Sequence, residues 1–250
     1  MKELIVQKLK EIEKENNVRI LLAVESGSRA WGFASPDSDY DVRFIYVRPK
    51  EDYLRLETVR DVIELPIDDT LDINGWDLRK TLRLLYRSNP TLFEWFSSPI
   101  VYTETPFADR LRAVMTDYYL QKNSLYHYLS TAERNYREYL KGDVVRAKKY
   151  FYVLRPVLAC RWILGRHTPP PMKFCDLAEA ELPSELAEDV RRLLELKIMS
   201  PEIKEIPRID AINGFLDEQI GTIKDILVRM TDERGRDMEK LDELFLSAVI

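Results

Sequence analysis

The residues that most constrain this chain are 25–47, with the sequence ESGSRAWGFASPDSDYDVRFIYV. They continue an apolar, β-branched run at 18–25, which predicts a buried strand. They end in a run at 41–48 that alternates well enough to predict a second strand. Between the two, Gly27-Ser28 forms a sharp turn that we expect to lead into one short helical turn. This order of elements predicts a small α/β head near the start of the chain.

Asp39 and Asp41 stand at the entry to the second predicted strand. Because side chains alternate along a strand, both carboxylates share one face, roughly 6–7 Å apart. Carboxylates this close repel each other, and a divalent cation between them removes the penalty. A site that offers only oxygen ligands suits Mg²⁺ or Mn²⁺. We therefore expect Asp39 and Asp41 to be catalytic metal ligands.

The turn at Gly27-Ser28 has the character of a phosphate cradle. Glycine lets the backbone come close to a ligand, and Ser28 with exposed amides at a helix start can bind phosphate oxygens. A phosphate cradle beside an Asp-x-Asp metal clamp is what nucleotidyl transfer from an NTP requires. Taken alone, an Asp-x-Asp pair is usually a turn or a solvated edge, and a Gly-Ser turn is commoner still. Their combination, an eleven-residue gap apart, favours the catalytic interpretation.

Two-metal chemistry usually takes a third carboxylate from a neighbouring strand. Asp72, in the short segment before the next helix, is the expected third catalytic and metal-binding residue. Asp68, Asp69 and Asp77 compete with it on proximity in sequence. Asp77 suits a helix N-cap better, because it directly precedes an apolar-periodic run.

The rest of the chain turns helical and mostly stays so. Two short strands are expected at 61–65 and 70–73, and helical periodicity dominates from Trp76 onward. We predict an α+β fold, in which a small mixed sheet flanked by helices is followed by an all-helical C-terminal domain. The expected boundaries are 1–103 for the head and 104–250 for the helical domain.

Composition excludes several classes of protein. No apolar run in the 250 residues approaches the roughly 18 that a membrane helix needs, and the charged N-terminal segment is not a secretory signal. Cys160 and Cys175 are too few for a disulfide framework or a four-ligand zinc site. We expect a cytoplasmic protein with no membrane partner.

The net charge of −5 is unevenly spread. Residues 1–118 carry a net charge of −4, residues 119–175 carry +8, and residues 176–250 carry −9. The basic middle segment has the right sign to receive a polyanion such as a nucleotide or RNA. Lys149 and Arg155 on its second helix are expected to contact the triphosphate or the acceptor RNA. Ordinary solvated helix faces are the alternative interpretation.

The combination of a Gly-Ser turn with an Asp-x-Asp pair eleven residues later resembles the DNA polymerase β-like nucleotidyltransferase superfamily, in which these two features mark the active site. A longer match is similar to the RNA repair pathway nucleotidyltransferases, the RlaP or YcgL-like group. The stretches that carry it are 27–35 (GSRAWGFAS), 37–43 (DSDYDVR), 75–80 (GWDLRK), 88–90 (SNP) with 94–95 (EW), and 148–156 (KKYFYVLRP).

The resemblance implies a nucleotidyltransferase head fused to a helical domain, with NTP as substrate, Mg²⁺ as cofactor and a link to RNA repair. The expected nucleotide-binding residues are Gly27, Ser28, Arg29 and Ser38, together with the two basic residues named above. Three alternatives stay open: a protein acceptor, as in antitoxin-type AMPylation, a small-molecule acceptor, or a nucleotide- or RNA-binding module without catalysis. The paired aspartates disfavour the last, because a mere binder has no reason to keep a costly carboxylate pair.

Overall fold

The structure is a computed structural model that describes residues 1–66, 70–199, 205–231 and 237–249. The chain forms two compact units. The first unit consists of Met1–Ala30, Asp39–Tyr119 and Gly235–Ile250. The second consists of Trp31–Ser38 and Leu120–Arg234.

These units divide the chain differently from the boundary expected between 103 and 104. The first unit also takes in α6 (Pro106–Met115) and the C-terminal helix α12 (Glu239–Val249). The second takes in the loop Trp31–Ser38, which lies between the two halves of the Gly-Ser and Asp-x-Asp pattern. The division follows hydrophobic packing, because Leu241 and Leu244 of α12 join the core beneath the sheet of the first unit.

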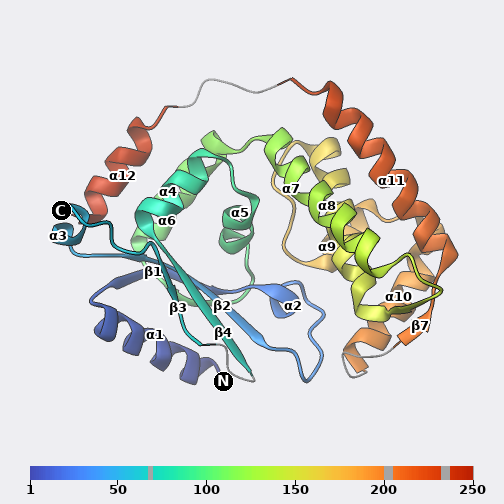
Figure 1. Cartoon of the computed structure of the whole chain (residues 1–250), viewed down its shortest axis with the longest axis horizontal. Helices are drawn as coiled ribbons and strands as arrows, with labels where there is room; N and C mark the ends of the chain where they lie inside the picture. Colours follow the sequence, from blue (N-terminus) through green and yellow to red (C-terminus); the bar gives the residue numbers. More distant parts are fainter. Residues whose placement is uncertain (67–69, 200–204, 232–236, 250) are drawn as a thin grey trace. The chain divides into compact units, whose positions relative to one another are not determined.

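A five-stranded mixed sheet is the frame of the first unit, with the strand order β3-β4-β2-β1-β5 (Figure 1). Its strands are β1 (Arg19–Glu25), β2 (Tyr40–Val47), β3 (Val62–Glu64), β4 (Leu71–Asp77) and β5 (Val101–Glu104). β2 and β4 run parallel, and every other neighbouring pair is antiparallel. The predicted mixed sheet is confirmed. The sequence analysis placed no strand at β5.

Helices cover both faces of this sheet. The helix α1 (Lys2–Asn16) packs Ile5, Leu9 and Ile12 on one face, in a core shared with residues of β1, β2 and β4. The helices α4 (Leu78–Tyr86), α5 (Pro90–Phe96), α6 and α12 share a core with the opposite face. Figure 1 shows α1 on one side of the strands and α4 and α6 on the other.

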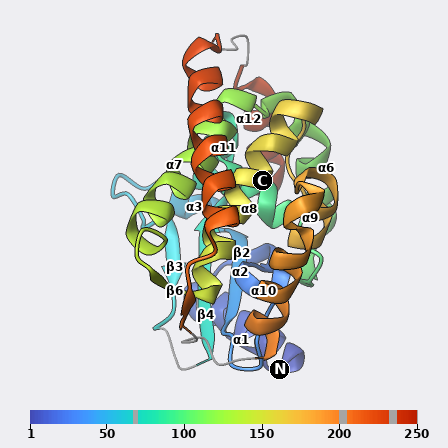
Figure 2. The ribbon, with the colours of Figure 1, turned by 90° about the vertical axis from the view of Figure 1, so that its right-hand side faces the viewer.

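The second unit is mainly helical. Its helices are α7 (Gln121–Tyr139), α8 (Ala147–Arg166), α9 (Phe174–Glu181), α10 (Ala187–Met199) and α11 (Asp210–Arg229). Figure 2 shows α11 alongside α7 and α8, with which it packs. A short antiparallel ribbon joins β6 (Val144–Arg146) to β7 (Glu205–Pro207). Although helical periodicity is expected throughout this region, the β-branched Val144-Val145 pairs with the strand at 205–207, and α8 begins only at Ala147. None of the described helices is long and apolar enough to cross a membrane.

The loop Trp31–Ser38 is built into the core of the second unit. Phe33 is 1% exposed, and its ring lies 5.0 Å from that of Phe151 and 5.8 Å from that of Phe174. The Trp31 carbonyl accepts a hydrogen bond from the Phe174 amide at 2.9 Å. The buried ammonium of Lys197 donates to the Ser35 hydroxyl at 2.9 Å. Apolar packing and a buried polar contact therefore both fix this loop.

We expect Phe33→Ala to lower the free energy of unfolding by about 3–5 kcal/mol, because the lost ring leaves a cavity against Phe151 and Phe174. Urea unfolding followed by circular dichroism measures the change. Leu54→Ala is the matched control, since Leu54 is 74% exposed and its truncation should stay within about 0.5 kcal/mol. Equal effects of the two variants would contradict this role for the loop.

Candidate functional site

The candidate site begins where β1 ends and the four-residue helix α2 (Gly27–Ala30) starts. Gly27 has φ +58°, a left-handed conformation that favours glycine. A methyl group on its Cα would overlap Oδ2 of Asp41. The Ser26 amide donates to the Asp41 carbonyl at 2.8 Å. The carboxylate of Asp41 therefore packs directly on the glycine turn, which only glycine permits.

Asp72 lies beside Asp41. The parallel pairing of β2 with β4 sets these two residues opposite each other in register. Nη2 of Arg43 contacts both carboxylates, at 3.2 Å from Oδ1 of Asp41 and 2.6 Å from Oδ2 of Asp72. Nη1 of the same guanidinium donates to the carbonyls of Val42 and Asp72 at 3.0 and 2.9 Å. One cation thus bridges the two strands at the carboxylate pair.

Sequence reasoning assigned no role to Arg43. The signal that could have found it is its spacing, because a residue two positions after Asp41 in a strand lies on the same face. A like-charged carboxylate on the neighbouring strand then makes a bridging cation favourable. Recognising this requires the β2–β4 register, which no local pattern provides.

Asp39 completes the acidic edge from just before β2 and is exposed. Its carbonyl accepts from Nε of Arg29 at 3.1 Å, and the Arg29 guanidinium lies 3.7 Å from the centroid of the Tyr40 ring. Arg29 therefore fixes the backbone at the entry to the strand. Of the competing acidic residues, Asp68 and Asp69 lie outside the described residues.

The electrostatics of the site favour a bound cation. Burial raises the pKa of Asp41, and the negative charges of Asp72 and Asp39 add to the rise. Arg43 and Arg29 oppose it by favouring the ionised form. Burial and two neighbouring negative charges disfavour the ionised form of Asp41, so a further positive charge would stabilise that form.

The donor set fits a hard divalent cation. Asp41 and Asp72 offer only oxygen ligands, with side chains 29% and 31% exposed, and Asp39 adds a further carboxylate. Such donors suit Mg²⁺ or Mn²⁺. Within the described ranges, no three Asp, Glu, His or Cys side chains are gathered into a ready group for a metal. The Arg43 guanidinium is the cation that neutralises the pair in this structure.

A fully buried carboxyl group hydrogen-bonds to the backbone of the site. Glu25, at the end of β1, is 0% exposed, and its Oε1 accepts from the Asp41 amide at 2.8 Å. Its Oε2 accepts from the Tyr102 hydroxyl, and its carbonyl accepts from Ser98 Oγ at 2.6 Å. Burial raises the pKa of Glu25. The sequence analysis missed this residue, whose only signal is an acidic residue that closes an apolar strand.

The other expected nucleotide-binding residues fall in two groups. Gly27, Ser28 and Arg29 belong to the first unit, whereas Ser38, Lys149 and Arg155 belong to the second. Ser38 is buried, where its Oγ accepts from the Ser35 amide at 2.9 Å.

Arg155 differs from the solvent-facing residue that its helical spacing predicts. It is 5% exposed, its Nε donates to the Met172 carbonyl at 3.4 Å, and its guanidinium lies 4.6 Å from the Trp31 ring centroid. The reason is that α8 is buried nearly all round, so it has no wide polar face. Lys149 is half-buried, and its ammonium lies 3.6 Å from the Tyr139 ring centroid.

Asp77, a further competitor for the third carboxylate, is the N-cap of α4, which confirms that interpretation of the sequence. Its Oδ1 accepts from the Arg79 amide at 2.7 Å, and its Oδ2 accepts from the Tyr53 hydroxyl at 2.8 Å. Asp77 is the last residue of β4 and Asp72 the second, so five positions, or about 17 Å of strand, separate them. Asp77 therefore lies away from the acidic edge.

Comparison with known proteins places the chain among nucleotidyltransferases. A family model described as the RNA repair pathway DNA polymerase beta family (RlaP) matches residues 1–247. The chain is 49% identical over 251 residues to the uncharacterized protein YcgL of Bacillus subtilis (strain 168), covering 100% of this chain and 96% of that protein.

Two solved structures match the chain at low similarity. One is a nucleotidyltransferase-like protein from Exiguobacterium sibiricum 255-15, with a TM-score of 0.31, 13% identity, and coverage of 98% of this chain and 89% of that chain. The other is the spectinomycin adenyltransferase AAD(9) from Enterococcus faecialis with ATP and spectinomycin, with a TM-score of 0.43, 11% identity, and coverage of 90% and 98%. At these TM-scores neither structure bears on the chemistry of this site.

The buried cap at Asp77 generates a pH-dependent prediction. Burial raises the pKa of Asp77 above its usual 3.8, against the hydrogen bonds from Tyr53 and Arg79 and the nearby charge of Arg48. The folded state therefore holds this proton to a higher pH than the unfolded chain does. Stability falls as pH rises from about 3.8 through the folded pKa, because the unfolded state releases its proton first.

Asp77→Asn keeps a capping oxygen but removes the titration. We expect the free energy of unfolding of the wild type, relative to Asp77→Asn, to decrease with rising pH and then level off. Urea unfolding of both proteins at a series of pH values measures this difference. A difference that grows in favour of the wild type as pH rises would contradict the raised pKa.

Proposed function

Because the chain belongs to the RNA repair pathway DNA polymerase beta family, we propose that it transfers a nucleoside monophosphate from an NTP to an RNA end. The observation that supports this most is the carboxylate pair of Asp41 and Asp72, set in register on β2 and β4. The glycine turn at Gly27 lies directly against one of them. A half-buried acidic pair packed against a glycine turn that leads into a helix is the arrangement that we propose for nucleotidyl transfer.

In the proposed reaction, the hydroxyl oxygen of the acceptor attacks the α-phosphorus of the NTP. The bond between that phosphorus and the bridging oxygen breaks, and pyrophosphate leaves. An aspartate of the acidic edge takes the hydroxyl proton. Asp39, Asp41 and Asp72 would hold Mg²⁺ or Mn²⁺, which when bound neutralises charge on the phosphates and the leaving group. No covalent protein intermediate is required, because positioning and electrostatics lower the barrier.

The chain's own residues arrange the acidic edge before any substrate arrives. Glu25 fixes the Asp41 backbone by accepting a hydrogen bond from the Asp41 amide. Arg43 contacts both carboxylates and holds them side by side on neighbouring strands. Gly27 keeps the turn free of side-chain bulk, and Ser28 offers a hydroxyl to a phosphate oxygen. Such preorganisation reduces the rearrangement needed at the moment of reaction.

RNA is the proposed acceptor because of the family and the charge distribution. The net +8 of residues 119–175, in a chain of net −5, supplies the sign that a phosphate backbone requires. Most of this segment lies in the second unit. Of the two basic residues predicted to contact phosphate, we propose Lys149. We assign Arg155 instead to holding Trp31 and Met172, given its burial.

We expect the purified chain, incubated with Mg²⁺ or Mn²⁺ and each of the four α-labelled NTPs, to transfer label to RNA. Asp41→Asn and Asp72→Asn should each lower the rate by about a hundredfold or more, because each removes a carboxylate that would hold the divalent cation. Asp109→Asn is the matched control. Asp109 is an exposed carboxylate of α6 paired with Arg112, and its loss should leave the rate unchanged.

The acceptor arms of this assay separate the alternatives. Label on protein would mean that the acceptor is a protein side chain and not RNA. Label on an added small molecule would mean that the acceptor is a small molecule. No transfer to any acceptor, with NTP binding retained, would leave a nucleotide- or RNA-binding module. Full activity in both Asp→Asn variants would refute the assignment of the acidic edge.

A charge reversal tests the second unit separately. We expect Lys149→Glu to raise the KM for NTP or RNA by roughly tenfold with little change in kcat, the effect of one lost charge-assisted hydrogen bond in binding. Lys173→Glu, an exposed lysine of the same unit, is the control for net charge. Steady-state kinetics with each substrate varied in turn measures both. Equal shifts in the two variants would mean that general charge, not this position, is responsible.

A further inference from the structure

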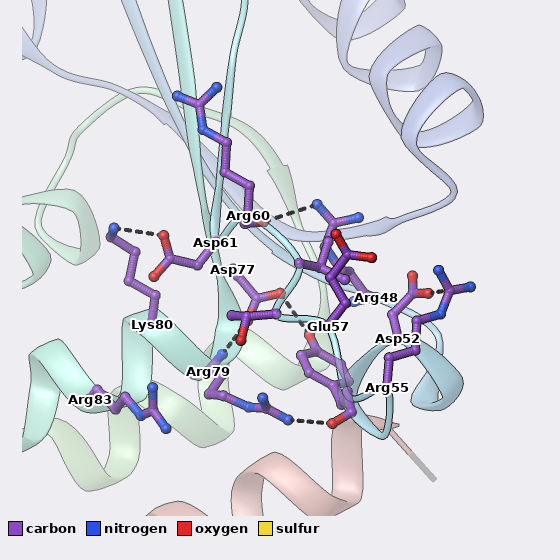
Figure 3. A pocket seen from close by; sticks show the side chains of 13 residues that line it. Arg48, Asp52, Arg55, Glu57, Arg60, Asp61, Asp77, Arg79, Lys80 and Arg83 are labelled. Carbon is purple, nitrogen blue, oxygen red and sulfur yellow. Dashed lines mark hydrogen bonds and ion pairs between the residues drawn. The ribbon is translucent and has the colours of Figure 1, made fainter.

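A basic cavity lies at the opposite end of β2 and β4 from the acidic edge (Figure 3). Its volume is about 340 Å³, and all of its lining residues belong to the first unit. Arg48 follows the last residue of β2 and stands seven positions after Asp41. Since a strand rises about 3.3 Å per residue, roughly 20 Å separates this cavity from the acidic edge. The proposed reaction does not use it.

The fold places this cavity where ligands commonly bind in sheets of parallel strands. β2 and β4 run parallel, and both end here, at Val47 and Asp77. Crevices at the carboxyl ends of parallel strands are general ligand-binding positions. Helix α4 starts directly after β4, so its amino end adjoins the cavity.

Positive charge dominates the lining. Six cationic side chains face four carboxylates, and the cations are Arg48, Arg55, Arg60, Arg79, Lys80 and Arg83. Three of the carboxylates already have partners: Asp61 binds Lys80 at 3.0 Å, Asp52 binds Arg55 at 3.1 Å, and Asp77 caps α4. Arg60 pairs with Glu64 outside the lining. The cations left after these ion pairs are Arg48, Arg79 and Arg83, against the carboxylates of Asp77 and Glu57.

The cations on α4 stand against a general rule of helix stability. Arg79 and Lys80 lie in its first turn, which contains no acidic residue and is preceded by the N-cap Asp77, whereas Arg83 lies in its last turn. The amino end of a helix carries partial positive charge, so cations there are unfavourable and anions favourable. A bound anion would relieve this repulsion. Sequences break such local rules mainly at functional positions.

Among the described residues, one basic side chain has no partner, and Arg48 uses only part of its guanidinium, whose Nη2 donates to the Arg60 carbonyl at 3.3 Å. In the described part of the chain, the guanidinium of Arg83 makes no hydrogen bond or ion pair, and Figure 3 shows it extending from α4 beside Lys80 and Arg79. Nε of Arg48 is buried and likewise has no hydrogen-bond partner among the described residues. An unpaired buried donor is costly, and a ligand oxygen would satisfy it. By contrast, Arg79 is held by the Tyr53 carbonyl at 3.2 Å and by the Tyr53 ring.

We propose that this cavity binds a small oligophosphate-bearing anion, with Arg83, Lys80 and Arg48 as the groups that contact its phosphates. Arginine and lysine are the usual phosphate-binding side chains, and arginine adds a planar pair of donors. The volume lies within the range of small-ligand sites and exceeds what a single phosphate fills. The site is separate from the proposed catalytic edge and requires no metal.

Isothermal titration of the full chain with inorganic pyrophosphate and with tripolyphosphate, both in EDTA, tests this site apart from catalysis. The wild type should bind, and Arg83→Glu should weaken binding at least tenfold. Arg87→Glu is the matched control, because Arg87 is exposed one turn further along the same chain segment and lies outside the cavity lining. Its affinity should stay within twofold of the wild type.

Two further proteins keep the result interpretable. Arg83→Lys should retain most of the affinity, and Asp41→Asn should bind as the wild type does, which separates this cavity from the acidic edge. Circular dichroism should show that every variant is folded. The proposal fails if the wild type does not bind either anion, if Arg83→Glu and Arg87→Glu weaken binding equally, or if Asp41→Asn alone alters it. Arg83-dependent binding of an RNA oligonucleotide without binding of either oligophosphate would also overturn it in favour of an RNA contact.

Discussion

The parallel pairing of β2 with β4 is the interaction on which the first unit depends. Its register sets Asp41 opposite Asp72 at one end and Tyr46 opposite Asp77 at the other. The first juxtaposition costs electrostatic energy, which Arg43 offsets by contacting both carboxylates. One strand pair therefore positions residues of both the acidic edge and the basic cavity. These two sites are about 20 Å apart.

Two glycines make room for side chains of β2. Gly75 on β4 lies opposite Phe44 on β2, and a methyl group at Gly75 would overlap the Phe44 ring. Gly27 plays the same part for the carboxylate of Asp41. The missing side chain of Gly75 leaves room for the Phe44 ring, and that of Gly27 leaves room for the Asp41 carboxylate. Substitution at either would displace the strand that carries the acidic edge.

The loop Trp31–Ser38 links the two units in a way that constrains the proposed chemistry. The chain leaves the first unit after Ala30, the last residue of α2, and returns to it at Asp39. Within the second unit, Phe33 and the Lys197–Ser35 hydrogen bond fix the loop in place. The helical unit is therefore tied by two short connections to the turn and to the Asp-x-Asp pair.

The sequence by itself determined the mixed-sheet head, the turn at Gly27 against an Asp-x-Asp pair, and the N-cap at Asp77, because strand period, glycine conformation and capping are local properties. Only the tertiary structure decided that Arg43 bridges Asp41 and Asp72, that Glu25 supports them, and that α12 joins the first unit. It also turned Arg155 from an expected surface residue into a buried one. Such features depend on strand register and on which apolar faces find each other, and these are set by contacts between residues far apart in the chain.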